Sequence, residues 1–186
     1  HADWHGWTPT DLVFPFFLFI VGVAIVLSVE GRRERGVERG VLLRAIWRRA
    51  AVLFGLGIFL NAFPFVKDFV TFDLKEWQAL RIPGVLQRIG LCYGIVATAV
   101  LFARPRELLG VTLTCLFGYW ALMTLVPVPG VTEWGIHDKD THLAAYIDRA
   151  VFGTHLWVGA KTWDPEGLLS TLPALATTLM GVATGR

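Results

Sequence analysis

Charged residues are scarce in this sequence. Asp, Glu, Lys and Arg make up 17% of its 186 residues, whereas 54% of the residues are hydrophobic and the mean hydropathy is +0.55. Soluble globular domains carry about 25% charged residues. The shortage argues against a water-soluble domain and, together with the high apolar content, excludes a disordered chain.

Cysteines and the common catalytic signatures are also missing. Only Cys92 and Cys115 occur, both inside apolar runs, which excludes a disulfide-stapled scaffold and predicts two buried thiols. The sequence has no P-loop, no GxGxxG, no CxxC and no nucleophile elbow. His, Asp and Lys gather in 137–142, but their spacing fits no standard metal site, so we expect no metal. The arginine-rich segment adjoins apolar runs, so we expect no nucleic acid partner.

Long apolar runs are what the sequence has instead. Leu12–Val29 is an uncharged run that, as a helix, is about 27 Å long and nearly crosses the hydrocarbon layer of a bilayer. Four further runs are similar in length. The sequence therefore predicts an all-α fold, a polytopic transmembrane helix bundle. We expect about five spans, at Leu12–Val29, Ala50–Val66, Ile82–Ala103, Leu108–Val126 and Leu168–Thr184.

Basic residues fall on one side of this bundle when the spans alternate in direction. The side that holds residues 30–49 carries ten Lys and Arg against four Glu, whereas the other side carries seven against eleven acidic residues. Because cytoplasmic loops are rich in Lys and Arg, we expect 30–49 in the cytoplasm, and His1 and the 127–167 loop outside. The alternative is an amphipathic surface protein, but the uncharged runs are too long for one.

The first eleven residues place acids and imidazoles at the mouth of the first span. Thr8 has the pattern of a helix cap, with Asp11 bonding back to its amide. Pro15 removes a helical N–H and predicts a kink beneath Asp11, so this carboxylate serves either the helix or a site. His1 and His5 could each take a proton from a nucleophile or accept an acyl group, or anchor the chain at the interface. Their spacing does not choose between them.

An arginine inside the third span is a further candidate. Arg88 lies about 7.5 Å beyond Pro83 along the expected helix. Exposure to lipid there would cost about 2.5–3.5 kcal/mol, so we expect Arg88 to face the bundle interior. It is either a structural side chain, snorkelling or salt-bridged, or a binder of an anion or oxyanion. Before the last span, Asp164 and Pro165 have the pattern of a helix cap and first helical residue.

Three segments resemble a known family. HADWHGWTPTDLVFPFF at 1–17 closely resembles the H-A-x-W-x-G-x-T-x-x-D-L-V-F-P-W/F-F block of the heparan-alpha-glucosaminide N-acetyltransferase family, including its bacterial homologues. RIPGVLQR at 81–88 is similar to the second block of that family, and DPEGLLSTLPALATTLMG at 164–181 to the third. The resemblance runs from His1 to the C-terminus.

The resemblance implies an enzyme that moves acetyl from cytosolic acetyl-CoA, its co-substrate, to the amine of a terminal glucosamine across the membrane. The proposed catalytic histidine of the family corresponds to His1, which Asp11 would orient. Arg88 or the N-terminus of the first span would stabilise the thioester oxyanion. Candidates for gripping the sugar are Asp148, His155 and Glu166. The candidates for binding the phosphates of CoA are Arg44, Arg48 and Arg49. The positive-inside rule explains these three arginines equally well.

Two other functions stay open at this point. The same polar groups would suit an amino-sugar (N-acetylglucosamine-related) transporter, or a scaffold subunit in which Arg88 forms a salt bridge. Members of the family have more spans, so we expect 1–186 to be part of a single transmembrane acyltransferase domain, with further spans on both sides. Expected partners are an amino-sugar or glycan substrate, the lipid bilayer and a second copy of the chain as a homodimer. The expected location is the inner membrane of a bacterium.

Overall fold

The chain folds into a bundle of helices that follow the apolar runs of the sequence. The computed structural model describes residues 8–68, 73–74, 80–131 and 138–186. The long helices are α1 (Val13–Ile25), α3 (Arg39–Ala62), α4 (Val85–Phe102), α5 (Pro105–Leu125) and α7 (Thr171–Gly185). Shorter elements are the 3₁₀ turn η1 (Pro9–Leu12), the π-helical turn η2 (Val26–Glu30), α2 (Gly31–Glu34), α6 (Leu143–Phe152), and the strands β1 (Val66–Asp68) and β2 (Asp73–Leu74).

The expected all-α bundle is confirmed, with one small addition, the antiparallel pair β1 and β2 between α3 and α4. Among the described residues, three helical runs are long and apolar enough to cross a membrane: Pro9–Glu34, Val85–Phe102 and Pro105–Leu125. The protein is therefore a membrane protein. Helices α3 and α7 overlap the other two expected spans, although α3 begins eleven residues before Ala50, and the count of five stays a prediction.

The helix cap at the start of the first span is confirmed, and the expected kink stays a prediction. The backbone amide and the hydroxyl of Thr8 donate to Oδ2 of Asp11, at 2.7 and 2.9 Å. The helix changes type at this point, because η1 ends at Leu12 and α1 begins at Val13. Pro15 thus falls in the first turn of α1, where its missing N–H breaks no helical bond.

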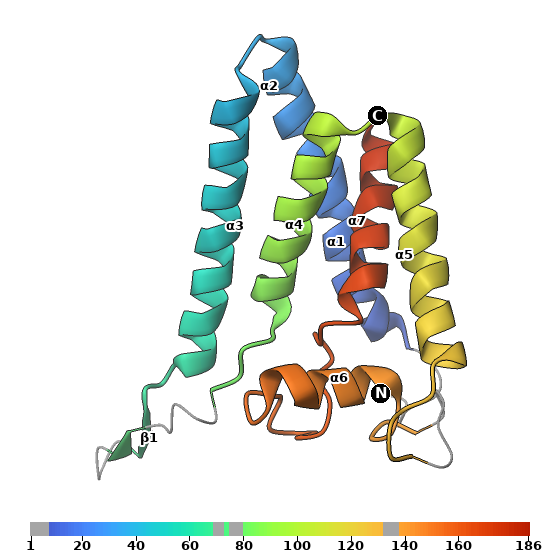
Figure 1. Cartoon of the computed structure of the whole chain (residues 1–186). Helices are drawn as coiled ribbons and strands as arrows, with labels where there is room; N and C mark the ends of the chain where they lie inside the picture. Colours follow the sequence, from blue (N-terminus) through green and yellow to red (C-terminus); the bar gives the residue numbers. More distant parts are fainter. Residues whose placement is uncertain (1–7, 69–72, 75–79, 132–137) are drawn as a thin grey trace.

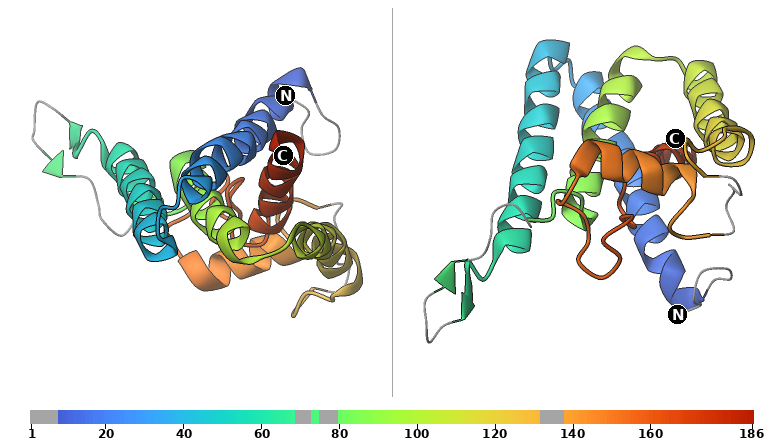
Figure 2. Two further views of the ribbon diagram at one scale, coloured as in Figure 1. Left: turned by 90° about the horizontal axis from the view of Figure 1, so that it is seen from above. Right: turned by 60° about the horizontal axis from the view of Figure 1, so that its bottom comes forward.

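Helices α1 and α7 meet backbone to backbone. A Cβ on Gly22 would lie 2.0 Å from the carbonyl oxygen of Thr178, and a Cβ on Gly181 would lie 2.0 Å from that of Phe19. Small residues at such crossings let transmembrane helices approach closely. Helix α4 packs against both α1 and α7, with α3 on its far side and α5 beside α7 (Figure 2). The centre of the bundle is thus formed by α1, α4 and α7.

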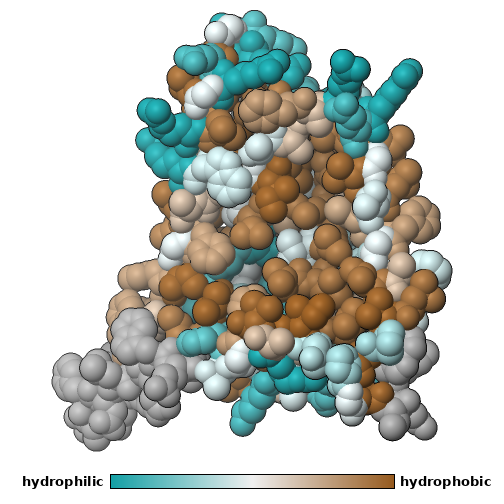
Figure 3. All heavy atoms as spheres, in the orientation of Figure 1, coloured by the Kyte–Doolittle hydropathy of each residue, from teal (hydrophilic) through white to brown (hydrophobic). Residues whose placement is uncertain are grey.

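An apolar belt separates two polar ends of the bundle (Figure 3). Helix α2 and the start of α3 form one end, and α6 lies across the other (Figure 1). This is the pattern of a bundle embedded in a bilayer, with apolar side chains facing lipid and polar ones at the two interfaces. The polar residues of the candidate site gather at the α6 end.

Candidate functional site

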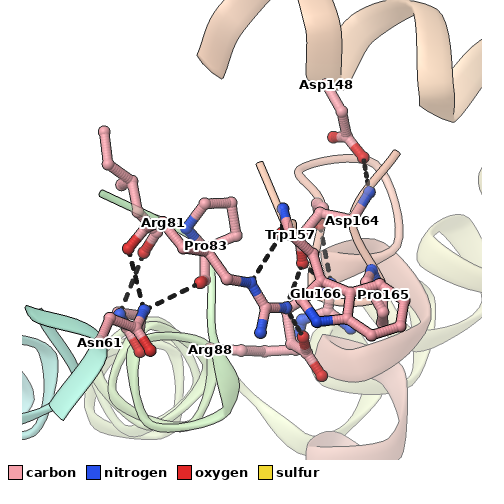
Figure 4. Close-up of polar contacts among 12 residues, drawn as sticks. Asn61, Arg81, Pro83, Arg88, Asp148, Trp157, Asp164, Pro165 and Glu166 are labelled. Carbon is pink, nitrogen blue, oxygen red and sulfur yellow. Dashed lines mark hydrogen bonds and ion pairs between the residues drawn. The ribbon is translucent and has the colours of Figure 1, made fainter. Parts of the chain in front are cut away.

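An ion cluster joins the segment just before α4 to the turn before α7. Arg81 donates from Nε to Oδ2 of Asp164 at 2.8 Å and from Nη2 to Oδ1 at 2.5 Å, and it also pairs with Glu166 (Figure 4). Two parallel bonds from one guanidinium to one carboxylate fix the orientation of both groups. The cluster therefore holds together two segments that the sequence separates by more than eighty residues.

The carboxylate of Asp164 is fully occupied by this cluster. Besides the two N–H groups of Arg81, the backbone amides of Trp157 and Glu166 donate to it, at 2.9 and 3.0 Å. Four donors saturate the lone pairs of a carboxylate, so Asp164 has an architectural role. Burial raises the pKa of the neighbouring Glu166, and the positive charge of Arg81 opposes that shift.

The segment around Asp164 is a turn and not the start of a helix. The amide of Gly167 donates to the carbonyl oxygen of Asp164 at 2.9 Å, and α7 begins only at Thr171, with Ser170 as its N-cap. The prediction that Asp164 and Pro165 begin the last helix is therefore wrong. The reason is that the side chain of Asp164 accepts bonds from a distant guanidinium and from loop amides, which stabilise the turn.

Asp148 on α6 binds the same turn through its side chain. Its side chain is buried, with 1% of the residue exposed, and its two oxygens accept from the backbone amides of Leu168, at 2.9 Å, and Asp164, at 3.3 Å. Burial raises the pKa of Asp148, and the two amide bonds oppose that shift. The proposed sugar-gripping residue thus has internal partners, and its geometry favours a positioning role.

Arg88 faces the bundle interior, as expected from the cost of exposing it to lipid. Only 8% of the residue is exposed. Its Nη2 donates to the carbonyl oxygen of Gly167 at 2.8 Å and to the hydroxyl of Ser170 at 2.5 Å, and its guanidinium carbon lies 5.9 Å from the centre of the Phe14 ring. Its buried Nε has no hydrogen-bond acceptor among the described residues. Arg88 is thus a positioned cation with an unused donor.

His155 joins the loop between α6 and α7 to the segment just before α4. Its Nδ1 bonds the carbonyl oxygen of Leu80 at 2.8 Å, and because a carbonyl only accepts, the ring proton lies on Nδ1. Its own carbonyl accepts from the amide of Ile82 at 3.0 Å. Asn61, at the end of α3, donates to the carbonyl oxygen of Arg81 at 2.9 Å. Sequence reasoning missed Asn61, although a carboxamide inside the apolar run Ala50–Val66 is a visible signal.

The proposed CoA-binding arginines lie on α3. Arg44, Arg48 and Arg49 are exposed in the first half of this helix. The structure does not bring them together with the ion cluster. Of these three, Arg49 lines a small cleft with Arg32 and with Tyr93 of α4.

The proposed catalytic pair is described only in part. His1 and His5 lie outside the described residues. Asp11 is exposed at the entrance of α1, one helical turn before Phe14, the ring that Arg88 lies against. Asp11 and Arg88 thus belong to the same end of the bundle. Within the described ranges, no three His, Cys, Asp or Glu side chains are grouped as metal ligands would be.

Comparison of the chain with known proteins identifies its family. The family described as heparan-alpha-glucosaminide N-acetyltransferase, catalytic, matches residues 3–186. The heparan-alpha-glucosaminide N-acetyltransferases of Homo sapiens and Mus musculus are 33% and 31% identical to this chain over 228 aligned positions, which cover 100% of it and 34% of each relative. The chain thus spans about a third of the length of these curated relatives. On this evidence, the chain belongs to the heparan-alpha-glucosaminide N-acetyltransferase family.

Proposed function

We propose that this protein is a transmembrane acetyltransferase that moves acetyl from cytosolic acetyl-CoA to the amine of a glucosamine-type sugar on the outer side of the membrane. The observation that carries the proposal is the family match over residues 3–186. The apolar helices support its location in a membrane. Residues 1–186 then form part of a single transmembrane acyltransferase domain.

The reaction requires a base, an oxyanion stabiliser and an acid. The amine nitrogen attacks the thioester carbonyl, the C–N bond forms, the C–S bond breaks, and the thiolate of CoA takes up the proton that the amine loses. We assign the base to His1, with Asp11 orienting it. In a two-step variant, His1 first accepts the acetyl group and then passes it to the amine.

Arg88 is our candidate for stabilising the oxyanion. A tetrahedral intermediate places negative charge on the former carbonyl oxygen, and a preorganised donor in a site shielded from water stabilises that charge strongly. Arg88 is preorganised because Gly167 and Ser170 hold Nη2. Its Nε is a buried donor without an acceptor among the described residues.

The outer loop would contact the sugar through its more accessible acid. Glu166 has 13% of its side chain exposed, whereas Asp148 is buried and bonded to backbone amides. We therefore assign a direct contact with the sugar to Glu166. Asp148 and His155 then act by positioning the loop, since their hydrogen bonds join it to α6 and to the entrance of α4.

Two ends with different chemistry suit a reaction across a membrane. We place Arg44, Arg48 and Arg49 on the cytoplasmic side, where guanidinium groups would meet the phosphates of CoA. The Arg81–Asp164–Glu166 cluster then lies at the outer end. In this arrangement acetyl-CoA enters from the arginine-rich end, and the sugar enters beneath α6.

The test is acetyl transfer by the full-length protein in membranes. Membranes that contain it are incubated with radiolabelled acetyl-CoA and glucosamine, with His1→Ala as the catalytic variant and His5→Ala as its matched control. Label on the sugar that is lost in His1→Ala and kept in His5→Ala supports the proposal. Unmodified sugar accumulating inside vesicles would overturn it in favour of a transporter.

A further inference from the structure

A cavity of about 470 Å³ lies beside the ion cluster, between the end of α5, the start of α6 and the turn before α7. Its volume falls within the range typical of sites for small molecules. The aromatic side chains of Tyr119, Trp120 and Trp163 form much of its lining. Trp163 is itself held edge-to-face by Trp157, with ring centres 6.1 Å apart. The ring of Trp163 is therefore oriented by a neighbouring ring, whereas Trp120 is an exposed aromatic side chain of α5.

The polar groups of this cavity offer only a few hydrogen bonds. Asp164 lines it, but four protein donors already occupy its carboxylate. The hydroxyl of Thr124 donates to a backbone carbonyl at 2.7 Å and keeps its lone pairs as acceptors. The hydroxyl of Ser170 accepts one bond from Arg88 and keeps a second lone pair. The lining is thus aromatic and apolar in large part, and besides the hydroxyls of Thr124 and Ser170 it includes the phenol of Tyr119 and the ring of His142.

A pyranose ring matches this combination. Its axial C–H groups form apolar faces that pack on aromatic rings, and its hydroxyls donate to acceptors at the rim. A purely apolar ligand would bring no donor to the remaining lone pairs of the Thr124 and Ser170 hydroxyls, each of which already makes a hydrogen bond within the protein. A strongly anionic ligand would face the carboxylate of Asp164.

We propose that the cavity between Trp120 and Trp163 is a pyranose-binding subsite that takes a hexosamine ring. The proposal rests on the proposed function, because it names where the acceptor sugar is held. Ser170 joins the cavity to the candidate oxyanion site, since its hydroxyl lines the cavity and also accepts from Arg88. A sugar in the cavity thus lies next to the turn that fixes Arg88. A single sugar ring that packs on aromatic side chains and makes few hydrogen bonds should bind weakly. Weak binding suits a site from which the acetylated sugar must leave after each turnover.

Substitution of the stacking residues tests the subsite. Trp120→Ala and Trp163→Ala in the full-length protein should each raise the KM for glucosamine by about tenfold, with the KM for acetyl-CoA within about twofold of wild type. Trp163→Tyr, which keeps a ring, should restore most of the affinity. Phe117→Ala is the matched control for Trp120→Ala, because Phe117 is an exposed aromatic residue of α5, 64% exposed against 58%, that does not line the cavity.

A binding measurement separates this proposal from the proposed function. Saturation-transfer NMR with glucosamine and the full-length protein in nanodiscs should give a signal that Trp120→Ala and Trp163→Ala reduce and Phe117→Ala does not. Binding that needs both tryptophans, in a protein that acetylates nothing, would support the subsite and overturn the enzyme. Acetylation with an unchanged KM for glucosamine in both tryptophan variants would overturn the subsite and leave the enzyme standing.

Discussion

Asp148 and Gly167 approach so closely that no side chain fits between them. A Cβ added to Gly167 would lie 2.0 Å from Oδ2 and 2.5 Å from Oδ1 of Asp148. The backbone of Gly167 also supplies the carbonyl that accepts from Arg88. One glycine therefore lets α6 anchor the turn before α7 and lets that turn hold the buried arginine.

The first prediction concerns this contact. Gly167→Ala should destabilise the protein by about 2 kcal/mol or more, because the buried carboxylate of Asp148 must move away from the two amides that it accepts. Thermal unfolding of the purified protein in detergent measures the loss. Gly110→Ala is the control, since a Cβ there meets nothing within 4 Å. Equal unfolding temperatures for the two variants would show that Gly167 is not a packing constraint.

Local sequence patterns predicted part of this architecture. The positions of the helices follow from apolar runs, and the inward orientation of Arg88 follows from the cost of placing a guanidinium in lipid. The bond from Thr8 to Asp11 follows from a three-residue spacing. Each of these depends on residues that are close in the sequence or on the bilayer as solvent.

Contacts between distant segments could not be predicted in the same way. Asp164 still accepts from the amide of Glu166, two residues on, but Arg81 binds the same carboxylate from 83 residues away, and no helix starts there. Asp148 was predicted to grip the sugar, whereas tertiary packing leaves it 1% exposed and bonded to backbone amides. A single sequence gives no sign of which distant donor will meet which acceptor, so the roles within the outer loop were the least predictable.

The second prediction concerns the Arg81 cluster. Arg81→Met should cost about 3–5 kcal/mol, because it leaves Asp164 and Glu166 as uncompensated buried charges. Arg81→Lys should recover only part of the loss, since an ammonium cannot make the bidentate contact. Chemical denaturation followed by circular dichroism measures both variants.

A single ion pair at the other end of the bundle provides the control for Arg81. Arg186 pairs with Glu30 at 2.6 Å, in an exposed contact. Arg186→Met should cost no more than about 1 kcal/mol, as exposed ion pairs do. A loss in Arg81→Met no larger than that in Arg186→Met would mean that the cluster adds nothing beyond a surface salt bridge.

The third prediction concerns pH. His142 is the N-cap of α6, where its Nδ1 accepts from the amide of Ala145 at 3.0 Å, and burial lowers its pKa. The folded protein therefore resists protonation that the unfolded chain, with a pKa of about 6.5 for this residue, accepts. Stability should be full above about pH 6.5 and should fall as the pH drops below it, by up to about 1.4 kcal/mol per pH unit.

A variant without a titrating group isolates this effect. Asparagine is a strong N-cap, so His142→Asn should keep the bond to the amide of Ala145 and remove the imidazole. The difference in unfolding free energy between the two proteins should then change between pH 7 and pH 5. A constant difference over that range would show that His142 does not control the acid sensitivity of the fold.

The last prediction separates chemistry from architecture at Arg88. Arg88→Lys keeps a positive charge that can still bond the carbonyl of Gly167, so we expect the unfolding temperature to fall by only a few degrees. The ammonium cannot reproduce the fixed donor at Nε, so kcat for acetyl transfer should fall by about 10²–10³, the usual effect of removing an oxyanion donor. The KM values should change little, because the donor acts on charge that develops only in the transition state. Ser170→Ala is the comparison variant: it removes one of the two acceptors of Nη2 and leaves Nε in place, so kcat should fall less than in Arg88→Lys, whereas the KM for glucosamine should rise because Ser170 lines the proposed subsite. If Arg88 is only structural, the two variants should lose activity in proportion to their loss of stability. Turnover by Arg88→Lys within about threefold of wild type would exclude Arg88 from the reaction, because a positioned donor contributes far more than that.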